Sequence, residues 1–263
     1  KLATRGLVLQ HAAQQRGGAF HFNTAVTGIH ASDNRINGVT LSNGEQIMSP
    51  VVVNAAGPHS QAIIGLAGLK DRQNIQTRVL RHQTVHIDCP DSKSADGTKV
   101  MLYDTDTGSY VRDDTGTFVL VGSLGAKGES EESADPDRFS RNLSPNAVEP
   151  LYRLAQRIPS MGIPNTLSGL ADLWDVSDDW IPVYDRTDLD GFYLAIGTSG
   201  NQFKTAPAAG ELMGALIEAC ENGANHDLSP VQYALPYTGH QINLGFFSRN
   251  RSPNPASSLS VLG

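Results

Sequence analysis

The order of apolar and polar residues predicts helices and strands in alternation at the start of the chain. Apolar residues at helical spacing predict an amphipathic helix over Arg5–Arg16, which a Gly-Gly pair ends. Short strands are expected over Ala19–Phe22 and Thr24–His30. A further strand over Arg35–Leu41 is followed by an Asn-Gly hairpin turn. This alternation indicates an α/β arrangement.

A buried strand is expected next, at Val51–Val53, where a β-branched run without polar alternation is typical of a strand covered on both faces of a parallel sheet. The small residues of Asn54–Gly57 follow it and let a ligand or another backbone come close. Pro58 suits the first turn of a helix that continues over Gln61–Leu66. The junction suits a nucleotide, and tight packing of a helix on a strand explains the same residues equally well.

The pattern changes from Asn74, where strands follow one another with short turns between them. These strands are expected at Thr77–Ile87, Lys99–Tyr103, Ser109–Arg112 and Thr117–Val121. Such a series predicts an antiparallel sheet and a second layer or domain. The acidic run Gly128–Asp137 is interpreted as a solvated loop before a helix at Pro145–Arg157. Ile163–Val176 is predicted to return to the first layer as a long strand.

The glycine-containing junction at Gly191–Ala209 carries the strongest chemical signal. A short apolar strand runs into Gly-Thr-Ser-Gly and then into a helix that is expected to continue through Cys220. Gly197 and Gly200 let the backbone turn sharply, so that N–H groups can approach a ligand, and the helix start attracts negative charge. Lys204 adds a cation at that same end. The junction predicts a site for an anion or a polar ring edge; a plain strand-turn-helix with an exposed lysine is the alternative.

Composition narrows the class of protein. The 263 residues carry a formal net charge of -7 without clustered Lys and Arg, which argues against nucleic acid as a partner. No apolar run reaches about 18 residues, so we expect no membrane span. We expect a cytoplasmic location instead. Cys89 and Cys220 are far apart and are interpreted as reduced thiols. His82 and His86 would lie about 13 Å apart on one strand face, too far for one metal, and are interpreted as structural. No metal site is expected.

Three motifs in order resemble a known family. They are VVVNAAGPHS, WDVSDDWIPVYDR and FYLAIGTSGNQFKTAPAAGELMGALI. Their order and spacing resemble the FAD-dependent amine and amino-acid oxidoreductases of the D-amino-acid oxidase or dehydrogenase, glycine oxidase, sarcosine oxidase and dimethylglycine dehydrogenase type. The resemblance implies a mixed α/β and α+β fold, with an incomplete FAD-binding Rossmann-like domain and a mostly antiparallel substrate domain. It places residues 1–72 and 163–222 in the FAD-binding domain and residues 73–162 in the substrate domain. Residues 223–263 would form a C-terminal arm.

The resemblance also implies which residues bind FAD. The adenine end would lie near Val26, Ala55, Ala56 and Gly57, and the flavin ring edge near Gly197, Thr198, Ser199, Gly200, Asn201, Gln202, Phe203 and Lys204. In the sarcosine-oxidase-like branch the matching lysine holds the substrate carboxylate, so Lys204 has two compatible roles. Asp172 stands where one branch has a flavin-tethering cysteine, which implies non-covalent FAD.

Other departures concern the substrate pocket. Asn201-Gln202 replaces a His-Gly pair that is common in relatives, and the arginine of the glycine-oxidase branch is absent near Trp174. Tyr110 and Arg112 share one strand face at i,i+2 spacing and are candidates for a substitute carboxylate site. A surface pair on the sheet is the alternative. Lys204, Tyr110, Arg112 and Trp174 are therefore the predicted catalytic residues.

The implied activity is removal of a hydride from the carbon next to an amine, with transfer to flavin N5. The substrate would be an amino acid or a secondary amine. A hydroxy-acid or glycerol-phosphate flavin dehydrogenase, or a non-catalytic subunit of a flavoenzyme complex, is the alternative. The residues contain no G-x-G-x-x-G pyrophosphate motif. We therefore expect a missing N-terminal half or a complementary chain, and weak FAD binding and no activity by this chain alone.

Overall fold

The computed structural model describes the chain except residues 1, 89–100, 115–116, 126–131 and 262–263. Its helices are α1 (Leu2–Gln14), α2 (Ser60–Leu66), α3 (Glu149–Arg157) and α4 (Ala206–Glu221). Its strands are β1 (Val26–Ser32), β2 (Arg35–Leu41), β3 (Gln46–Met48), β4 (Val52–Asn54), β5 (Thr77–Asp88), β6 (Met101–Asp104), β7 (Ser109–Asp113), β8 (Phe118–Ser123), β9 (Ser168–Ser177), β10 (Val183–Arg186), β11 (Phe192–Ile196), β12 (Gln232–Ala234) and β13 (Gln241–Asn243). Short 3-10 turns include η1 (Gly57–His59), η3 (Pro145–Val148), η5 (Gln202–Thr205) and η6 (Leu244–Phe247).

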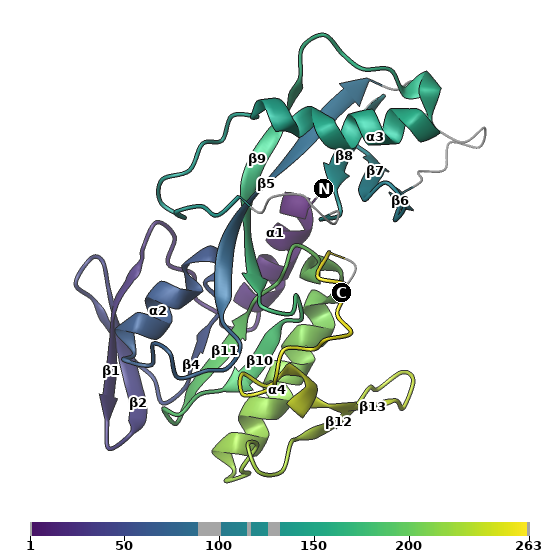
Figure 1. The fold of residues 1–263 in the computed structure, drawn as a ribbon. Helices are drawn as coiled ribbons and strands as arrows, with labels where there is room; N and C mark the ends of the chain where they lie inside the picture. The colour runs from purple at the N-terminus through teal and green to yellow at the C-terminus, as the bar shows by residue number, and fades with distance from the viewer. Residues whose placement is uncertain (1, 89–100, 115–116, 126–131, 262–263) are drawn as a thin grey trace.

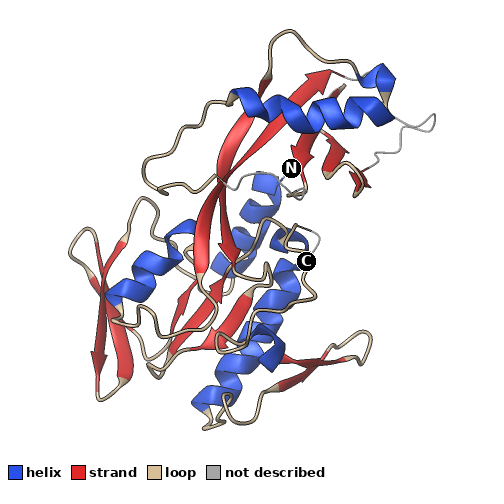
Figure 2. Cartoon of the chain, in the orientation of Figure 1, coloured by secondary structure: helices blue, strands red, loops and turns tan. Residues whose placement is uncertain are grey.

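The chain builds two parts that share their longest strands. The upper part in Figure 1 is an antiparallel sheet in the order β6-β7-β8-β5-β9, and α3 lies across it, as Figure 2 shows. The lower part contains the sheet β10-β11-β4, in which β4 runs parallel to β11, and α4 packs on β10. Strands β5 and β9 pair over ten positions and pass from the upper part into the lower one. Residues on one face of β5 and β9 can therefore lie near the turn that follows β11.

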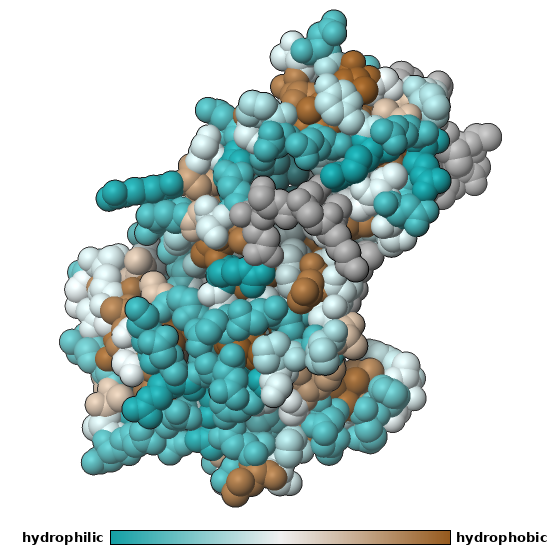
Figure 3. Space-filling view, viewed as in Figure 1, coloured by the Kyte–Doolittle hydropathy of each residue, from teal (hydrophilic) through white to brown (hydrophobic). Residues whose placement is uncertain are grey.

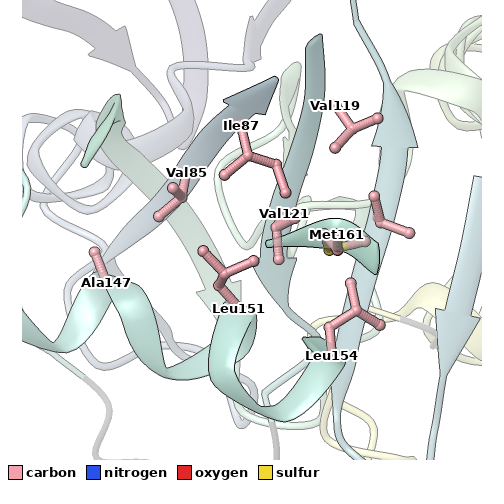
Figure 4. Close-up of a cluster of buried hydrophobic side chains, with 9 residues drawn as sticks. Val85, Ile87, Val119, Val121, Ala147, Leu151, Leu154 and Met161 are labelled. Carbon is pink, nitrogen blue, oxygen red and sulfur yellow. The ribbon is translucent and has the colours of Figure 1, made fainter. Parts of the chain in front are cut away.

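The core of the upper part fills only one face of the five-stranded sheet. Leu151 and Leu154 of α3 are fully buried against a cluster that includes Val85 and Val121 of the sheet (Figure 4). Because side chains alternate along a strand, the neighbours of Val85 on β5 point to the opposite face. That opposite face carries polar residues such as Thr84. The position of α3 thus decides which residues of β5 can line a site.

Most predicted elements are confirmed. The strand at Arg35–Leu41 has the expected bounds, the antiparallel sheet begins at Thr77, and the helical segment Pro145–Arg157 forms as η3 followed by α3. The predicted parallel pairing of the Val52 strand is confirmed by its register with Phe192 of β11. The mixed α/β fold with antiparallel sheets is confirmed as a whole.

Some local predictions are wrong. Ala19–Phe22 is not a strand but an irregular, exposed segment in which Phe20 and Phe22 stack on each other. Val53 was expected in a strand buried on both faces, but it is 41% exposed, because β4 is an edge strand of its sheet among the described residues. The first helix forms at α1, yet Leu7, with its apolar neighbours, is mostly exposed, so the expected buried face is absent there.

The described residues of the acidic run are mostly exposed, as expected of a solvated loop, and both they and the tail make polar contacts that involve a buried arginine. Residues 128–131 lie outside the described residues, but Glu132 pairs with the buried guanidinium of Arg81 at 2.7 Å. In the tail, Arg249 is 1% exposed and bonds Asp185 and Asp227. Buried ion pairs therefore attach this part of the tail to the lower part of the molecule. In the described part of the chain, no helix has the length and apolar character needed to cross a membrane.

Candidate active site

A cavity of about 640 Å³ lies between the free face of the upper sheet and the turn after β11. Its volume is in the range of small-molecule sites, about 300–1,000 Å³. The surface view in Figure 3 shows the molecule indented between the upper and lower parts. The cavity is lined by His82, Thr84, Met101, Tyr103, Tyr110, Arg112, Leu120, Leu170, Asp172, Trp174, Gly200, Asn201, Phe203, Lys204 and Val261. We call this cavity the cleft.

All four predicted catalytic residues line the cleft. Tyr110 and Arg112 lie on β7, Trp174 on β9 and Lys204 on η5, so segments far apart in sequence converge there. The expected i,i+2 placement of Tyr110 and Arg112 on one face is confirmed, because both side chains reach the cleft. Burial raises the pKa of Tyr110 to about 12, and Arg112 partly opposes this increase. Tyr110 is therefore a neutral hydrogen-bonding group near neutral pH.

The two cleft cations lack carboxylate partners in the described part of the chain. Arg112 is half-buried and Lys204 is exposed, and neither forms an ion pair there. Asp172 also lines the cleft but lies 3.6 Å from Arg141. Arg112 and Lys204 are thus available to bind an anionic group that enters the cleft.

The turn after β11 is held from within by a buried carboxylate. Asp175 is 3% exposed and accepts hydrogen bonds from the Gly197 N–H at 2.7 Å and from the Thr198 hydroxyl. Its backbone carbonyl accepts the Ser199 N–H at 2.8 Å. The expectation that the N–H groups at the start of this turn face a ligand is therefore wrong for Gly197 and Ser199, because Asp175 already occupies them.

The next residues keep the donors that the sequence led us to expect. The helix does not start directly after Gly200 but passes through η5 before α4 begins at Ala206. The N–H groups of Gln202 and Phe203 stand in the first turn of η5, where no intrahelical acceptor exists. Phe203 and Lys204 of the same turn line the cleft. The N–H groups that could meet an anion or a ring edge thus lie at Gln202 and Phe203, two to three residues after Gly200.

Trp174 connects the upper sheet with this turn. Its ring stacks on His82 with 3.7 Å between centroids, and it meets Trp180 edge-on at 6.2 Å. A Cβ on Gly200 would lie 2.7 Å from the indole, and Gly200 has a positive φ of 75°. Glycine is therefore needed at this position both for its backbone conformation and for the close approach of Trp174.

The predicted adenine-side residues lie apart from the cleft lining. Ala55, Ala56 and Gly57 follow β4, which runs parallel to β11, so both strand ends open at the same edge of their sheet. Gly57 has φ 54° and no atom within 4 Å of where a Cβ would stand. Val26 begins β1 in another sheet. Gly197, Thr198, Ser199 and Gln202 do not line the cleft either, whereas Gly200, Asn201, Phe203 and Lys204 do.

Sequence reasoning missed several cleft residues, of which three matter most for the site. His82 was interpreted as structural, but it lines the cleft with Thr84, two residues along the same face of β5. Val261 of the tail also lines it and accepts a hydrogen bond from Asn201 at 3.0 Å. Alternation along the strand could have grouped His82 with Thr84, but only the position of α3 shows which face is open.

The chain belongs to a family of FAD-dependent oxidoreductases. The model of the family described as DAO, FAD dependent oxidoreductase, matches residues 3–216, more than half of the chain. Sarcosine oxidase subunit beta from Rhizobium meliloti (strain 1021) is 27% identical over 202 residues, which are 75% of this chain and 44% of the relative. The chain thus spans less than half the length of this relative.

Solved structures share the fold. L-proline dehydrogenase from P. horikoshii superposes with a TM-score of 0.68 at 22% identity, covering 90% of this chain and 56% of that one. Glycine oxidase from Bacillus cereus ATCC 14579 superposes with a TM-score of 0.62 at 21% identity, covering 83% and 55%. At this level of identity the superpositions show the fold, and the family match carries the assignment to FAD-dependent oxidoreductases.

The residues present fit the ring end of FAD. The unpartnered N–H groups at the start of η5 and the cation of Lys204 suit the electron-rich pyrimidine edge of a flavin. The open space beside Gly57, at the carboxyl edge of a parallel strand pair, is where dinucleotides bind in α/β sheets.

Proposed function

We propose that this chain forms the substrate cleft and the flavin-ring surface of an enzyme that oxidises the C–N bond of an amino acid or a secondary amine. One observation carries the proposal: Lys204, Tyr110, Arg112 and Trp174, from three separate segments, line one cleft beside the turn that fits a flavin edge. The family match supports the redox chemistry. The relatives named sarcosine oxidase, glycine oxidase and L-proline dehydrogenase support an amine as the substrate.

Each residue has a role that follows from its charge and place. Arg112 binds the substrate carboxylate, since it is a fixed cation inside the cleft without a carboxylate partner in the described part of the chain. Tyr110, neutral because burial raises its pKa, donates a hydrogen bond to the same carboxylate. Lys204 holds either that carboxylate or the flavin edge. Trp174 forms an apolar wall that keeps water from the reacting carbon.

FAD, when bound, supplies the acceptor for the hydride that leaves the carbon next to the amine. The chain's own residues orient the substrate so that this carbon faces the η5 turn. We further propose that residues 1–72 and 163–222 form the FAD side of the molecule, residues 73–162 the substrate side and residues 223–263 an arm.

Bleaching of the visible flavin absorbance tests the proposal. The full-length protein, with the segment or chain that completes the FAD site, is loaded with FAD and mixed without oxygen with sarcosine, glycine or L-proline, and in parallel with glycolate or glycerol 3-phosphate. Bleaching by an amine supports the proposal; bleaching by glycolate or glycerol 3-phosphate alone favours the hydroxy-acid or glycerol-phosphate alternative. A full-length, FAD-loaded protein that none of these compounds bleaches would favour the non-catalytic subunit.

Substitution separates the role of the cleft cation from general effects on the fold. Arg112→Met is expected to raise KM for the amine substrate about 10–100-fold, the value of one charge-assisted interaction. Arg138→Met removes an equally charged, exposed side chain outside the cleft and is expected to leave KM within about twofold. Equal effects of the two variants would contradict the role of Arg112.

We also propose that the working enzyme includes a further polypeptide segment or chain that binds the FAD phosphates. Three observations support this: β4 is an edge strand among the described residues, α1 exposes apolar residues, and the similar sarcosine oxidase chains are beta subunits. Co-purification of the tagged chain from its own cells, with mass spectrometry of the bands, tests it. A cytoplasmic location, supported by the free thiol of Cys220, is proposed as well and is tested by cell fractionation.

A further inference from the structure

Two polar atoms in the cleft wall have no hydrogen-bond partner. His82 Nε2 and Thr84 Oγ1 are both buried, and neither finds a partner among the described residues. Both residues line the cleft, and their i,i+2 spacing places them on the same face of β5. Native proteins rarely leave such atoms unpaired, because each has lost its hydrogen bonds to water. Two such atoms side by side at a cleft indicate that the partner arrives with a ligand.

His86, four residues further along the same strand, is a useful comparison, because its Nε2 is likewise buried without a hydrogen-bond partner. Its Nε2 lies 3.5 Å from a carboxylate oxygen of Asp114, and the residue does not line the cleft. Asp172 stands opposite His82 on β9, but its carboxylate lies 3.6 Å from Arg141 and forms no ion pair with His82. The ring of His82 is held by the 3.7 Å stack on Trp174. The structure therefore fixes the ring of His82 but leaves Nε2 unpaired.

We propose that His82 binds the amine nitrogen of the substrate, with Nε2 accepting a hydrogen bond from the substrate N–H. The Thr84 hydroxyl, beside His82 on the same face of β5, contacts the same amine. This inference rests on the proposed amine oxidation. Two cations of the cleft, Arg112 and Lys204, already suit the carboxylate, whereas the amine has no other assigned acceptor. A neutral imidazole meets the amine without charge repulsion.

The charge state of the ring agrees with this role. Burial lowers the pKa of His82 to about 4, so near neutral pH one ring nitrogen keeps an unprotonated lone pair. Acceptance at Nε2 requires the tautomer with its proton on Nδ1. The ring then positions the amine and is not itself protonated in doing so.

Tryptophan fluorescence measures ligand binding in this cleft directly. The chain has two tryptophans, Trp174 in the cleft wall and Trp180 in contact with it, so their emission reports on this site. L-proline and cyclopentanecarboxylate are the probes, because they share a five-membered ring and a carboxylate and differ by the N–H. Each is titrated into the purified chain with and without added FAD.

The variants are His82→Phe, which keeps an aromatic ring for the stack, Thr84→Val, and His86→Phe as the matched control. His82→Phe is expected to weaken L-proline binding about tenfold and to leave cyclopentanecarboxylate binding within about twofold. Thr84→Val is also expected to weaken L-proline binding more than cyclopentanecarboxylate binding. His86→Phe is expected to change the affinity for neither probe. An equal loss for both probes would show that His82 only shapes the cleft and would overturn the proposal, as would no loss for either.

The flavin-bleaching assay separates this inference from the proposed function. Bleaching by L-proline that His82→Phe leaves unchanged in KM and kcat would overturn the role of His82 alone. A His82-dependent preference for L-proline over cyclopentanecarboxylate without bleaching by any amine would keep the amine site and remove the oxidation. If neither probe binds the unsubstituted chain, both proposals fall.

Discussion

At the scale of single residues, the site depends on contacts that sequence patterns indicate only in part. Period-two alternation was enough to place Tyr110 and Arg112 on one face, and the structure brings both to the cleft. The same rule applied to β5 could not show that His82 faces the cleft, because the position of α3 decides which face is covered. Likewise, nothing local showed that Asp175 would occupy the N–H groups of the glycine turn.

Gly200 provides a prediction at this scale. Gly200→Ala forces a Cβ to 2.7 Å from Trp174 and places alanine at a φ of 75°, so we expect a loss of about 2–5 kcal/mol of unfolding free energy. Gly44→Ala is the control, because its φ is 84° but nothing lies within 4 Å of the new methyl group. The control is expected to cost about 1–2 kcal/mol. Urea unfolding measures both values, and equal losses would mean that Trp174 does not press on Gly200.

His82 provides a second prediction, through the pH dependence of stability. Burial holds its pKa at about 4 in the folded chain, below the ordinary value of 6.5. The unfolded chain takes up the proton near pH 6.5 and the folded chain only near pH 4, so stability is full above 6.5 and is lost as pH falls toward 4. The total loss is on the order of 3 kcal/mol. The difference in unfolding free energy between the natural chain and His82→Phe should change across this window; a difference that is flat from pH 7 to 4 would contradict the buried neutral state.

At the scale of elements, strands and helices with a strong period were predictable, and elements fixed by distant contacts were not. The strand Arg35–Leu41 and the long strand from Thr77 formed as their patterns predicted. The exposure of Val53 was not predictable, because burial depends on what covers an edge strand rather than on its own residues. The tail was expected to wrap the surface, but its attachment through buried charges joins residues 60 or more positions apart.

Arg249 tests how the tail is attached. It is 1% exposed and bonds Asp185, Asp188 and Asp227. Arg249→Ala leaves the buried Asp185 carboxylate without its main partner, so we expect a loss of about 3–5 kcal/mol and faster trypsin cleavage in the tail. The exposed Arg141→Ala should cost under about 1 kcal/mol and leave the cleavage pattern unchanged. A tail that resists trypsin in Arg249→Ala would show that apolar contacts, rather than this ion network, hold it.

At the scale of the whole molecule, the chain carries the surfaces that we propose for the substrate and the flavin ring, whereas its residues contain no G-x-G-x-x-G motif for the pyrophosphate. The donors available to FAD are the start of η5, Lys204 and the open junction at Ala55–Gly57. These suit the ring edge and one close approach of the cofactor, but a pyrophosphate needs several N–H groups directed at it.

We therefore expect the purified 263-residue chain, mixed with excess FAD and then desalted, to retain far less than one flavin per chain. Absorbance of the desalted protein gives the ratio. FMN, which lacks the pyrophosphate and adenosine, serves as the control. The chain should retain FMN to the same extent as FAD. Stoichiometric FAD retention with poor FMN retention would show that this chain holds the pyrophosphate by itself, through a site other than a glycine-rich fingerprint.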